Sequence, residues 1–199
     1  MDPKLKFSAH INLAINKAKC LLSFIKRWAK EFNDPYTTKA LYVSLVRPIL
    51  EYASVLWCPY YNSYIDSLES VQKQFLLFAL RSLRRGSNFI LPPYENRLKL
   101  INLPTLRQRG TVANILFVFK LIDCCVDASF LLSFLSINVP ARNTRTYLPI
   151  KLKTSYLDLE PMRLTSIDFN EHYHLIHLSE TVTNLKRKLY SYFTNPLSN

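Results

Sequence analysis

Apolar residues in the stretch Lys39–Pro59 recur mostly at intervals of three and four residues. This spacing predicts a helix that is apolar over most of its circumference, and such a helix is buried by its neighbours. Pro48 lacks the backbone donor that an interior helical position uses, so we expect a kink there. Arg47 and Glu51 are four residues apart and predict an ion pair at the wet edge of the helix, the alternative being that Arg47 faces a phosphate.

The scarcity of glycine supports a helical fold for the whole chain. Only 2 of the 199 residues are glycine, and long stretches repeat with helical spacing. Sandwiches and barrels need frequent tight turns, which this composition does not provide. A hydrophobic content of 49% is enough for a sizeable core. We therefore predict an all-α fold, a multi-helix bundle around a buried, kinked central helix.

The other predicted helices cover residues 8–33, 64–85, 94–101, 105–122, 128–135 and 179–193. In contrast, residues 138–178 contain Pro140, Pro149 and Pro161 and show no sustained periodicity, which predicts an extended connecting segment. The expected organisation is a helical domain at 1–137, the extended segment at 138–178, and a C-terminal amphipathic helix and tail at 179–199.

Helix starts are predicted from residues whose side chains can cap a helix. Thr37 or Thr38 precedes the central helix, and Thr105 precedes the apolar helix that follows it. Ser63 and Asp66 have the spacing of a capping box, in which two side chains satisfy two backbone donors.

The chain is strongly basic, with 26 Lys and Arg against 14 Asp and Glu, a net charge of +12 and a pI near 9.6. Most of the excess lies in the first 110 residues, and it favours a polyanionic partner such as nucleic acid. The cations that share predicted helix faces or helix ends are Lys19, Lys26, Lys30, Arg81, Arg84, Arg85, Arg107 and Arg109.

Two of the three groups of cations also have a purely structural explanation. A charged face such as that of Lys19, Lys26 and Lys30 is often simply solvated. Basic residues in a last turn, where we place Arg81, Arg84 and Arg85, complement the helix dipole. Arg107 and Arg109 fall in a first turn, where the dipole disfavours cations, so an anionic partner accounts for them better.

Sequence motifs for catalysis or metal binding are missing. His174 and His177 would share a helix face, but the segment has no Cys partners and no HExxH order, so surface histidines are the simpler interpretation. No nucleophile elbow or glycine-rich phosphate loop occurs. We expect no resident cofactor and no activity from the chain alone.

The cysteines and the lengths of the apolar runs predict the cellular compartment of the protein. Cys20, Cys58, Cys124 and Cys125 have no CxxC spacing, and we interpret them as reduced thiols in an intracellular protein, most of them inside apolar helical patterns. No apolar run reaches the roughly 18 residues of a membrane span, so we expect no membrane partner.

Five blocks of sequence together resemble a known family. The string LY..LVRPILEYAS..W.P, from Leu41 to Pro59, is similar to the region downstream of the polymerase core in reverse transcriptases of jockey-like non-LTR retrotransposons. The similarity continues, in order, at Asp2–Ala18, Ile65–Phe75, Tyr94–Arg109 and Val139–Arg145. It therefore extends over most of the chain.

The resemblance implies a thumb and post-thumb region that holds RNA or an RNA/DNA hybrid, in the nucleus rather than the cytoplasm, with another protein of the element as a further partner. Polymerisation needs paired metal-binding carboxylates, and the chain has no Asp-Asp pair. The resemblance thus implies a non-catalytic piece of an RNA-directed DNA polymerase, with divalent metal bound only in the full-length enzyme. The alternative is a helical protein-interaction module, or a non-functional remnant whose basic surface is merely solvated. Leu77 and Gly110 depart from the family pattern, which has Arg at these positions.

Overall fold

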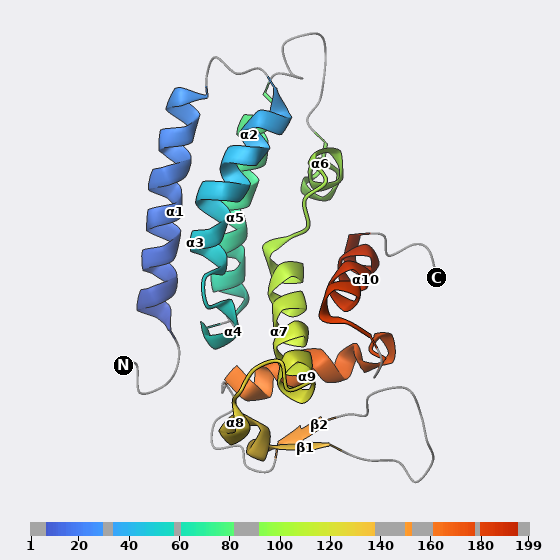
Figure 1. Cartoon of the computed structure of the whole chain (residues 1–199). Coiled ribbons are helices and arrows are strands. Elements are labelled where there is room, and N and C mark those ends of the chain that lie inside the picture. The colour runs from blue at the N-terminus through green and yellow to red at the C-terminus, as the bar shows by residue number, and fades with distance from the viewer. Residues whose placement is uncertain are drawn as a thin grey trace.

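The computed structural model describes residues 7–29, 34–57, 61–81, 92–137, 150–152, 161–177 and 180–194. Most of this part of the chain is helical, which confirms the all-α prediction (Figure 1). The helices are α1 (Ser8–Trp28), α2 (Pro35–Leu41), η1 (Tyr42–Val46), α3 (Arg47–Glu51), α4 (Ser54–Trp57), α5 (Asn62–Ala79), α6 (Tyr94–Ile101), α7 (Leu106–Ile122), α8 (Ser129–Phe134), α9 (Pro161–Glu171), η3 (Tyr173–Leu175) and α10 (Val182–Thr194). One short antiparallel pair, β1 (Leu135–Ile137) and β2 (Ile150–Leu152), was not predicted.

The central stretch is a series of helical segments rather than one kinked helix. α2 continues into η1, a π-helical turn in which the Arg47 N–H donates to the Tyr42 carbonyl. Pro48 follows directly, in the first turn of α3, where its missing N–H is tolerated. The chain then leaves the helix at Ala53, whose φ of 53° is left-handed, before α4.

Burial along this stretch is one-sided, so the prediction of an all-round buried helix is wrong. Tyr42, Val46 and Trp57 are buried, whereas Tyr52 is 75% exposed and Leu56 is 59% exposed. The neighbouring helices α1, α5 and α7 cover only one face of these segments, and the apolar residues opposite them remain at the surface.

The cap of α2 differs from the prediction. Asp34 is the N-cap, and its carboxylate accepts from the backbone N–H of Tyr36 at 3.2 Å and of Thr37 at 2.7 Å. Pro35 fills the first helical position, which suits its fixed φ. Thr38 is buried inside the helix instead of capping it.

The predicted capping box of the third helix is also wrong. α5 begins at Asn62, after Tyr61 as an N-cap without a side-chain cap bond, so Ser63 and Asp66 lie inside the helix. The Ser63 carbonyl instead accepts from the Ser67 hydroxyl at 2.7 Å.

The expectation of an extended chain through 138–178 is wrong for residues 161–175, which form α9 and η3. Pro161 stands at the first position of α9, where proline begins a helix rather than breaking it. Phe169 is fully buried against α7, so tertiary packing supplies the stability that the weak periodicity did not reveal. Residues 138–149 and 153–160 lie outside the described part of the chain.

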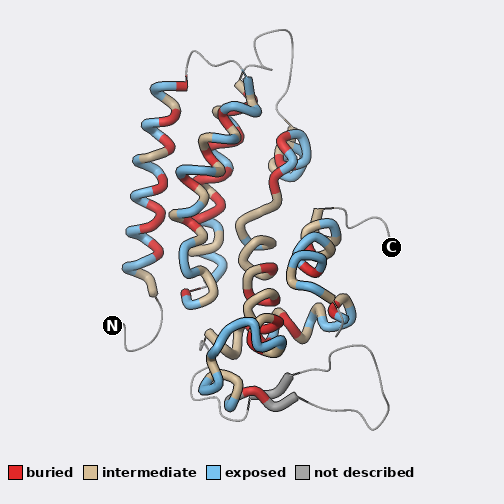
Figure 2. The backbone as a smooth tube through the Cα atoms, in the orientation of Figure 1, coloured by how far each residue is buried: buried red, intermediate tan, exposed pale blue. Residues whose placement is uncertain are grey.

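Two clusters of buried residues form the interior (Figure 2). The first core joins α1, η1, α3, α5 and α6, and its largest side chains include Tyr42, Phe75 and Leu76. The second core joins α7, β1, α9 and α10 around Phe119, Phe169 and Leu185. α7 belongs to both, since Leu106 packs on the first core and the later residues of the helix build the second.

We predict that Trp57→Ala destabilises the protein by about 3–5 kcal/mol, because a large buried ring is removed. Trp57 is 4% exposed, and its Nε1 donates to the Tyr52 carbonyl at 2.6 Å. The matched control is Trp28→Ala, at a position 70% exposed, which should change the free energy of unfolding by no more than about 0.5 kcal/mol. Urea denaturation monitored by circular dichroism measures both, and equal effects would contradict the burial pattern.

Candidate nucleic-acid interface

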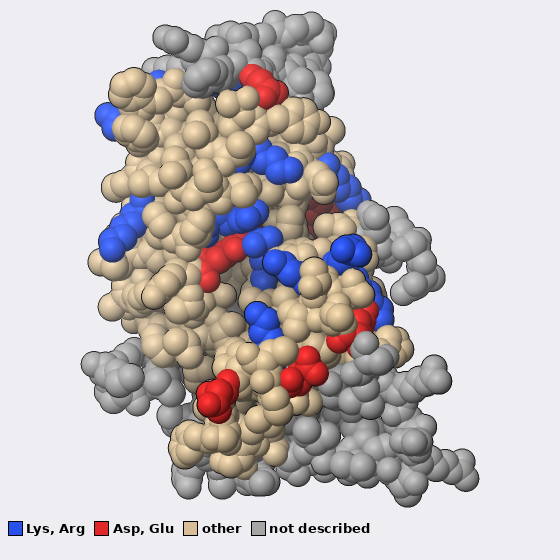
Figure 3. Space-filling view, viewed as in Figure 1, with Lys and Arg blue, Asp and Glu red and all other residues tan. Residues whose placement is uncertain are grey.

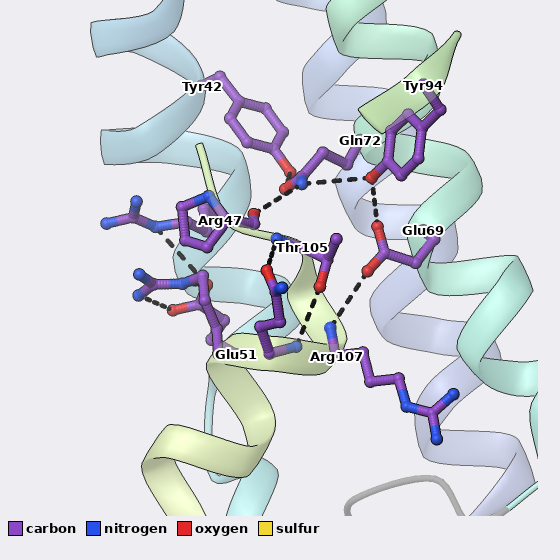
Figure 4. A network of polar contacts seen from close by, with 11 residues as sticks. Tyr42, Arg47, Glu51, Glu69, Gln72, Tyr94, Thr105 and Arg107 are labelled. Carbon is purple, nitrogen blue, oxygen red and sulfur yellow. Dashed lines mark hydrogen bonds and ion pairs between the residues drawn. The ribbon is translucent and has the colours of Figure 1, made fainter. Parts of the chain in front are cut away.

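A buried carboxylate, Glu69, lies where α5, α6 and α7 meet (Figure 4). Its Oε2 accepts from the Tyr94 hydroxyl at 2.5 Å, and its Oε1 accepts from the Arg107 backbone N–H at 3.1 Å. Burial, followed by the hydrogen bond to Glu69, raises the pKa of Tyr94, so the phenol stays a donor. The carboxylate therefore binds the positive end of the α7 dipole.

Gln72 extends this network into the first core. Its amide donates to the Pro104 carbonyl at 3.0 Å and accepts from the Tyr42 hydroxyl at 3.0 Å. Tyr42 also stacks on Phe75, with ring centroids 4.1 Å apart. The buried polar groups of η1, α5 and the segment before α7 are thus satisfied by one another.

The start of α7 is fixed by the predicted cap. The Thr105 hydroxyl accepts from the Gln108 N–H at 3.0 Å, and the Gln108 side chain accepts from the Thr105 N–H at 3.0 Å. This reciprocal pair is a capping box. Because Glu69 accepts from the Arg107 N–H, two of the free backbone donors in the first turn of α7 are satisfied without an external anion.

Glu51 at the end of α3 binds two arginines. It pairs with Arg47 at 3.6 Å, as predicted, and forms a two-point contact with Arg109, whose Nη2 lies 2.7 Å from Glu51 Oε2. The Arg109 guanidinium also lies 5.4 Å from the Tyr190 ring centroid. Burial lowers the pKa of Arg109, but its hydrogen bond and charge interaction with Glu51 outweigh burial and raise it.

The eight predicted nucleic-acid contacts therefore have different environments. Arg109 is held by Glu51, so an anion within the fold already occupies its guanidinium group. Contact of Arg109 with an external phosphate stays an untested prediction. Arg81 donates to the Ala29 carbonyl at 2.7 Å and lies 4.1 Å from the Phe78 ring, which gives it a structural role at the end of α1.

Five of the eight cations lie in the described part of the chain, and of these Lys19 and Arg107 are exposed. Within the described residues, neither side chain has a hydrogen bond or ion pair, and Figure 4 shows the Arg107 side chain leading away from Glu69. Lys26 is half-buried, and burial lowers its pKa. Lys30, Arg84 and Arg85 lie outside the described residues.

A cavity of about 450 Å³ lies between the two cores, and no sequence pattern predicted it. Apolar residues of α4, α5, α7 and α9 form most of its wall, and Arg107 and Lys186 bring positive charge to it. Figure 3 shows basic and acidic side chains meeting around a hollow near the middle of the molecule. Gly110 also lines the cavity, from inside α7, where glycine costs about 1 kcal/mol relative to alanine.

A buried amide and a half-buried carboxyl group meet in the cavity wall. Asn114 is 1% exposed, and its Nδ2 donates to Asp168 Oδ2 at 2.7 Å. Its Oδ1 is buried without a hydrogen-bond partner among the described residues. Burial raises the pKa of Asp168, and the hydrogen bond from Asn114 opposes this only in part.

The described residues also include the histidines, three of the cysteines and the most apolar helices. No group of three or more His, Cys, Asp or Glu that could hold a metal ion occurs among the described residues. His172 packs beside Phe193, with ring centroids 5.2 Å apart, while His174 and His177 are exposed.

Cys20, Cys124 and Cys125 are free thiols at the surface instead of small core residues. Of the helices that the structure describes, none has the length and apolar character that a membrane crossing requires.

Comparison with protein-family models, curated proteins and solved structures finds no match to this chain. The similarity to retrotransposon reverse transcriptases remains a prediction from the sequence.

We predict that Arg109→Gln lowers the free energy of unfolding by about 1–3 kcal/mol, because charge-assisted hydrogen bonds to Glu51 are lost. Glu51 keeps Arg47 as a partner, which limits the loss. Arg187→Gln, at an exposed position of α10, removes the same charge as a control and should have little effect. Chemical denaturation checks both, and indistinguishable midpoints would mean that the Glu51 contact adds no stability.

The half-buried Asp168 predicts a pH dependence of stability. Because its folded-state pKa is raised above the unfolded value, its ionisation destabilises the protein as the pH rises through that folded-state pKa. Asp168→Asn keeps an acceptor for Asn114 and should be more stable than the natural protein at neutral pH. This advantage should shrink as the pH falls toward the unfolded Asp pKa of about 3.9.

Urea unfolding at a series of pH values tests the effect, with Asp66→Asn, at an exposed position of α5, as the control for loss of one charge. A stability difference between Asp168→Asn and the natural protein that is constant across this range would contradict the assigned burial effect.

Proposed function

We propose that this chain is a non-catalytic nucleic-acid-binding module, derived from the thumb and post-thumb region of a jockey-like retrotransposon reverse transcriptase, that contacts an RNA/DNA hybrid through its basic surface. The observation that carries the proposal is the pairing pattern of its cations in a chain of net charge +12. Lys19, Arg107 and Lys186 have no ion pair within the described residues, whereas Arg109 and Arg47 share Glu51 as their ion-pair partner.

Cations without internal partners retain their full charge toward solvent, where they attract phosphates and release bound counterions from nucleic acid. The contacts would be to the backbone rather than to bases, so binding should tolerate changes of sequence. Lys30, Arg84 and Arg85 stay in the proposal on sequence grounds, and Arg81 and Arg109 leave it because their guanidinium groups serve the fold.

A second candidate, a protein-interaction module, is favoured by exposed apolar side chains on α1 to α4. Phe24, Trp28, Tyr36, Tyr52 and Leu56 are all at least 47% exposed. Large exposed aromatic residues are typical of interaction surfaces. The basic surface would then meet an acidic partner or keep the protein in solution.

The two candidates are separated by binding to a fluorescent RNA/DNA hybrid at several salt concentrations. Backbone binding predicts that log K falls with log salt by about 0.9 for each phosphate neutralised. Lys19→Gln and Arg107→Gln should each lower this slope by about one unit, and the pair Arg84→Gln with Arg85→Gln by about one to two units.

Arg109→Gln is the matched control, because its guanidinium is already occupied by Glu51 and its loss should leave the slope unchanged. Absence of hybrid binding at low salt, with the helical signal intact, would reject the nucleic-acid function in favour of the protein-interaction module. Nucleotide incorporation into a primer by the purified chain would reject the non-catalytic assignment.

A further inference from the structure

The cavity between the two cores has features of a built ligand site. Its volume of about 450 Å³ falls within the range of roughly 300–1,000 Å³ that small-molecule sites occupy. The wall is largely apolar, and the aromatic residues Trp57 and Tyr190 belong to it. Such a wall suits a flat, partly apolar ring system.

One residue of the wall independently indicates that a ligand here would carry a hydrogen-bond donor. Asn114 is 1% exposed, yet its Oδ1 has no hydrogen-bond donor among the described residues. Asp168 beside it is a second acceptor, and the pair is joined by the 2.7 Å bond from Asn114 Nδ2. A buried acceptor without a donor is costly, so a ligand with an N–H group would satisfy it.

The face of α7 orders these groups along the cavity. Arg107, Gly110 and Asn114 follow one another at helical spacing, and all three line it. Arg107 and Asn114 are seven residues apart, about 10 Å along the helix axis. The lining also includes Arg109, which is paired with Glu51, and Glu69, whose oxygens accept from Tyr94 and the Arg107 N–H. Arg107 and Lys186 are the lining cations without an ion pair among the described residues. An anionic group toward these cations and hydrogen-bond donors toward Asn114 therefore suit the cavity.

Gly110 lies between them. Among the described residues no glycine has a positive φ, so Gly110 is not needed for an unusual backbone conformation. Its missing Cβ instead leaves space in the cavity wall, at a helix position that favours any other non-proline residue. This gap is where a ring would lie against the backbone of α7.

We propose that this cavity binds one unstacked nucleotide of a single strand, with the exocyclic amino group of its base toward Asn114 and Asp168 and its phosphate toward Arg107 and Lys186. Adenine, cytosine and guanine carry such an amino group, whose two N–H donors match the two acceptors, whereas uracil offers a single ring N–H on that edge. Proteins that take a base out of its stack hold it in this way, between apolar walls and polar groups that read its edge. The inference rests on the proposed function in one respect, that the nucleotide belongs to a strand.

The test measures binding of the four ribonucleoside monophosphates and of a short oligoadenylate to the full chain by NMR titration. AMP, CMP or GMP should bind at least about threefold more tightly than UMP, since one buried hydrogen bond differs. The oligonucleotide should bind more tightly than AMP. Equal affinity for UMP, absence of saturable binding, or an oligonucleotide that does not compete with AMP would each overturn the proposal.

Neighbouring residues of α10 provide a matched pair of variants. Lys186 lines the cavity and the adjacent Arg187 does not, although both are exposed cations. Lys186→Gln should weaken AMP binding by about tenfold, as expected for a charge-assisted contact, and Arg187→Gln by less than about twofold. Equal effects of the two changes would assign the binding to general surface charge and overturn the cavity site.

Gly110→Leu fills the space in the cavity wall and should abolish nucleotide binding while the helical signal is retained. If this variant does not fold, the Lys186 and Arg187 pair decides alone. The outcomes also separate the two proposals. If Gly110→Leu binds both AMP and the hybrid as well as the natural protein does, only the cavity site is overturned. AMP binding without any hybrid binding overturns only the proposed backbone interface.

Discussion

The hydrogen bonds of Glu69 fix the arrangement of the helices around them. A buried carboxylate is costly unless its oxygens are satisfied, and here a phenol from α6 and a backbone N–H at the start of α7 both donate to it. One bond joins α5 to α6, and the other joins α5 to the start of α7. The same end of α7 carries Arg109, which binds Glu51, and Arg107, which lines the cavity between the cores.

The features that the sequence predicted correctly are those with local causes. The buried positions of α1 and α10 follow from helical spacing, and the Thr105 cap follows from a four-residue pattern. The π turn before Pro48 and the break at Ala53 were missed, because they depend on how the central stretch packs. α9 was missed for a related reason: Pro161 predicted a break, although it begins the helix, and Phe169 stabilises the helix from the second core.

The candidate site was predictable only in outline. Cations in the first turn of α7 predicted an anionic partner, and the structure places the internal carboxylate of Glu51 beside Arg109. No sequence rule connects these two residues, which are 58 positions apart. The same limit applies to Asn114 and Asp168, which are 54 positions apart and meet only after the helices pack. Exposed cations such as Lys19, by contrast, were identified from their helix face alone.

The sharing of α7 between both cores has a consequence for cooperativity. Loss of either core would strip one end of α7 of its packing, because Leu106 packs on the first and Val112, Ile115 and Val118 on the second. The free energies of opening of the two halves are therefore coupled through one helix. Amide hydrogens in the middle of α7 should exchange with solvent only when the whole molecule opens, whereas those of α8, outside both clusters, should exchange through local fraying.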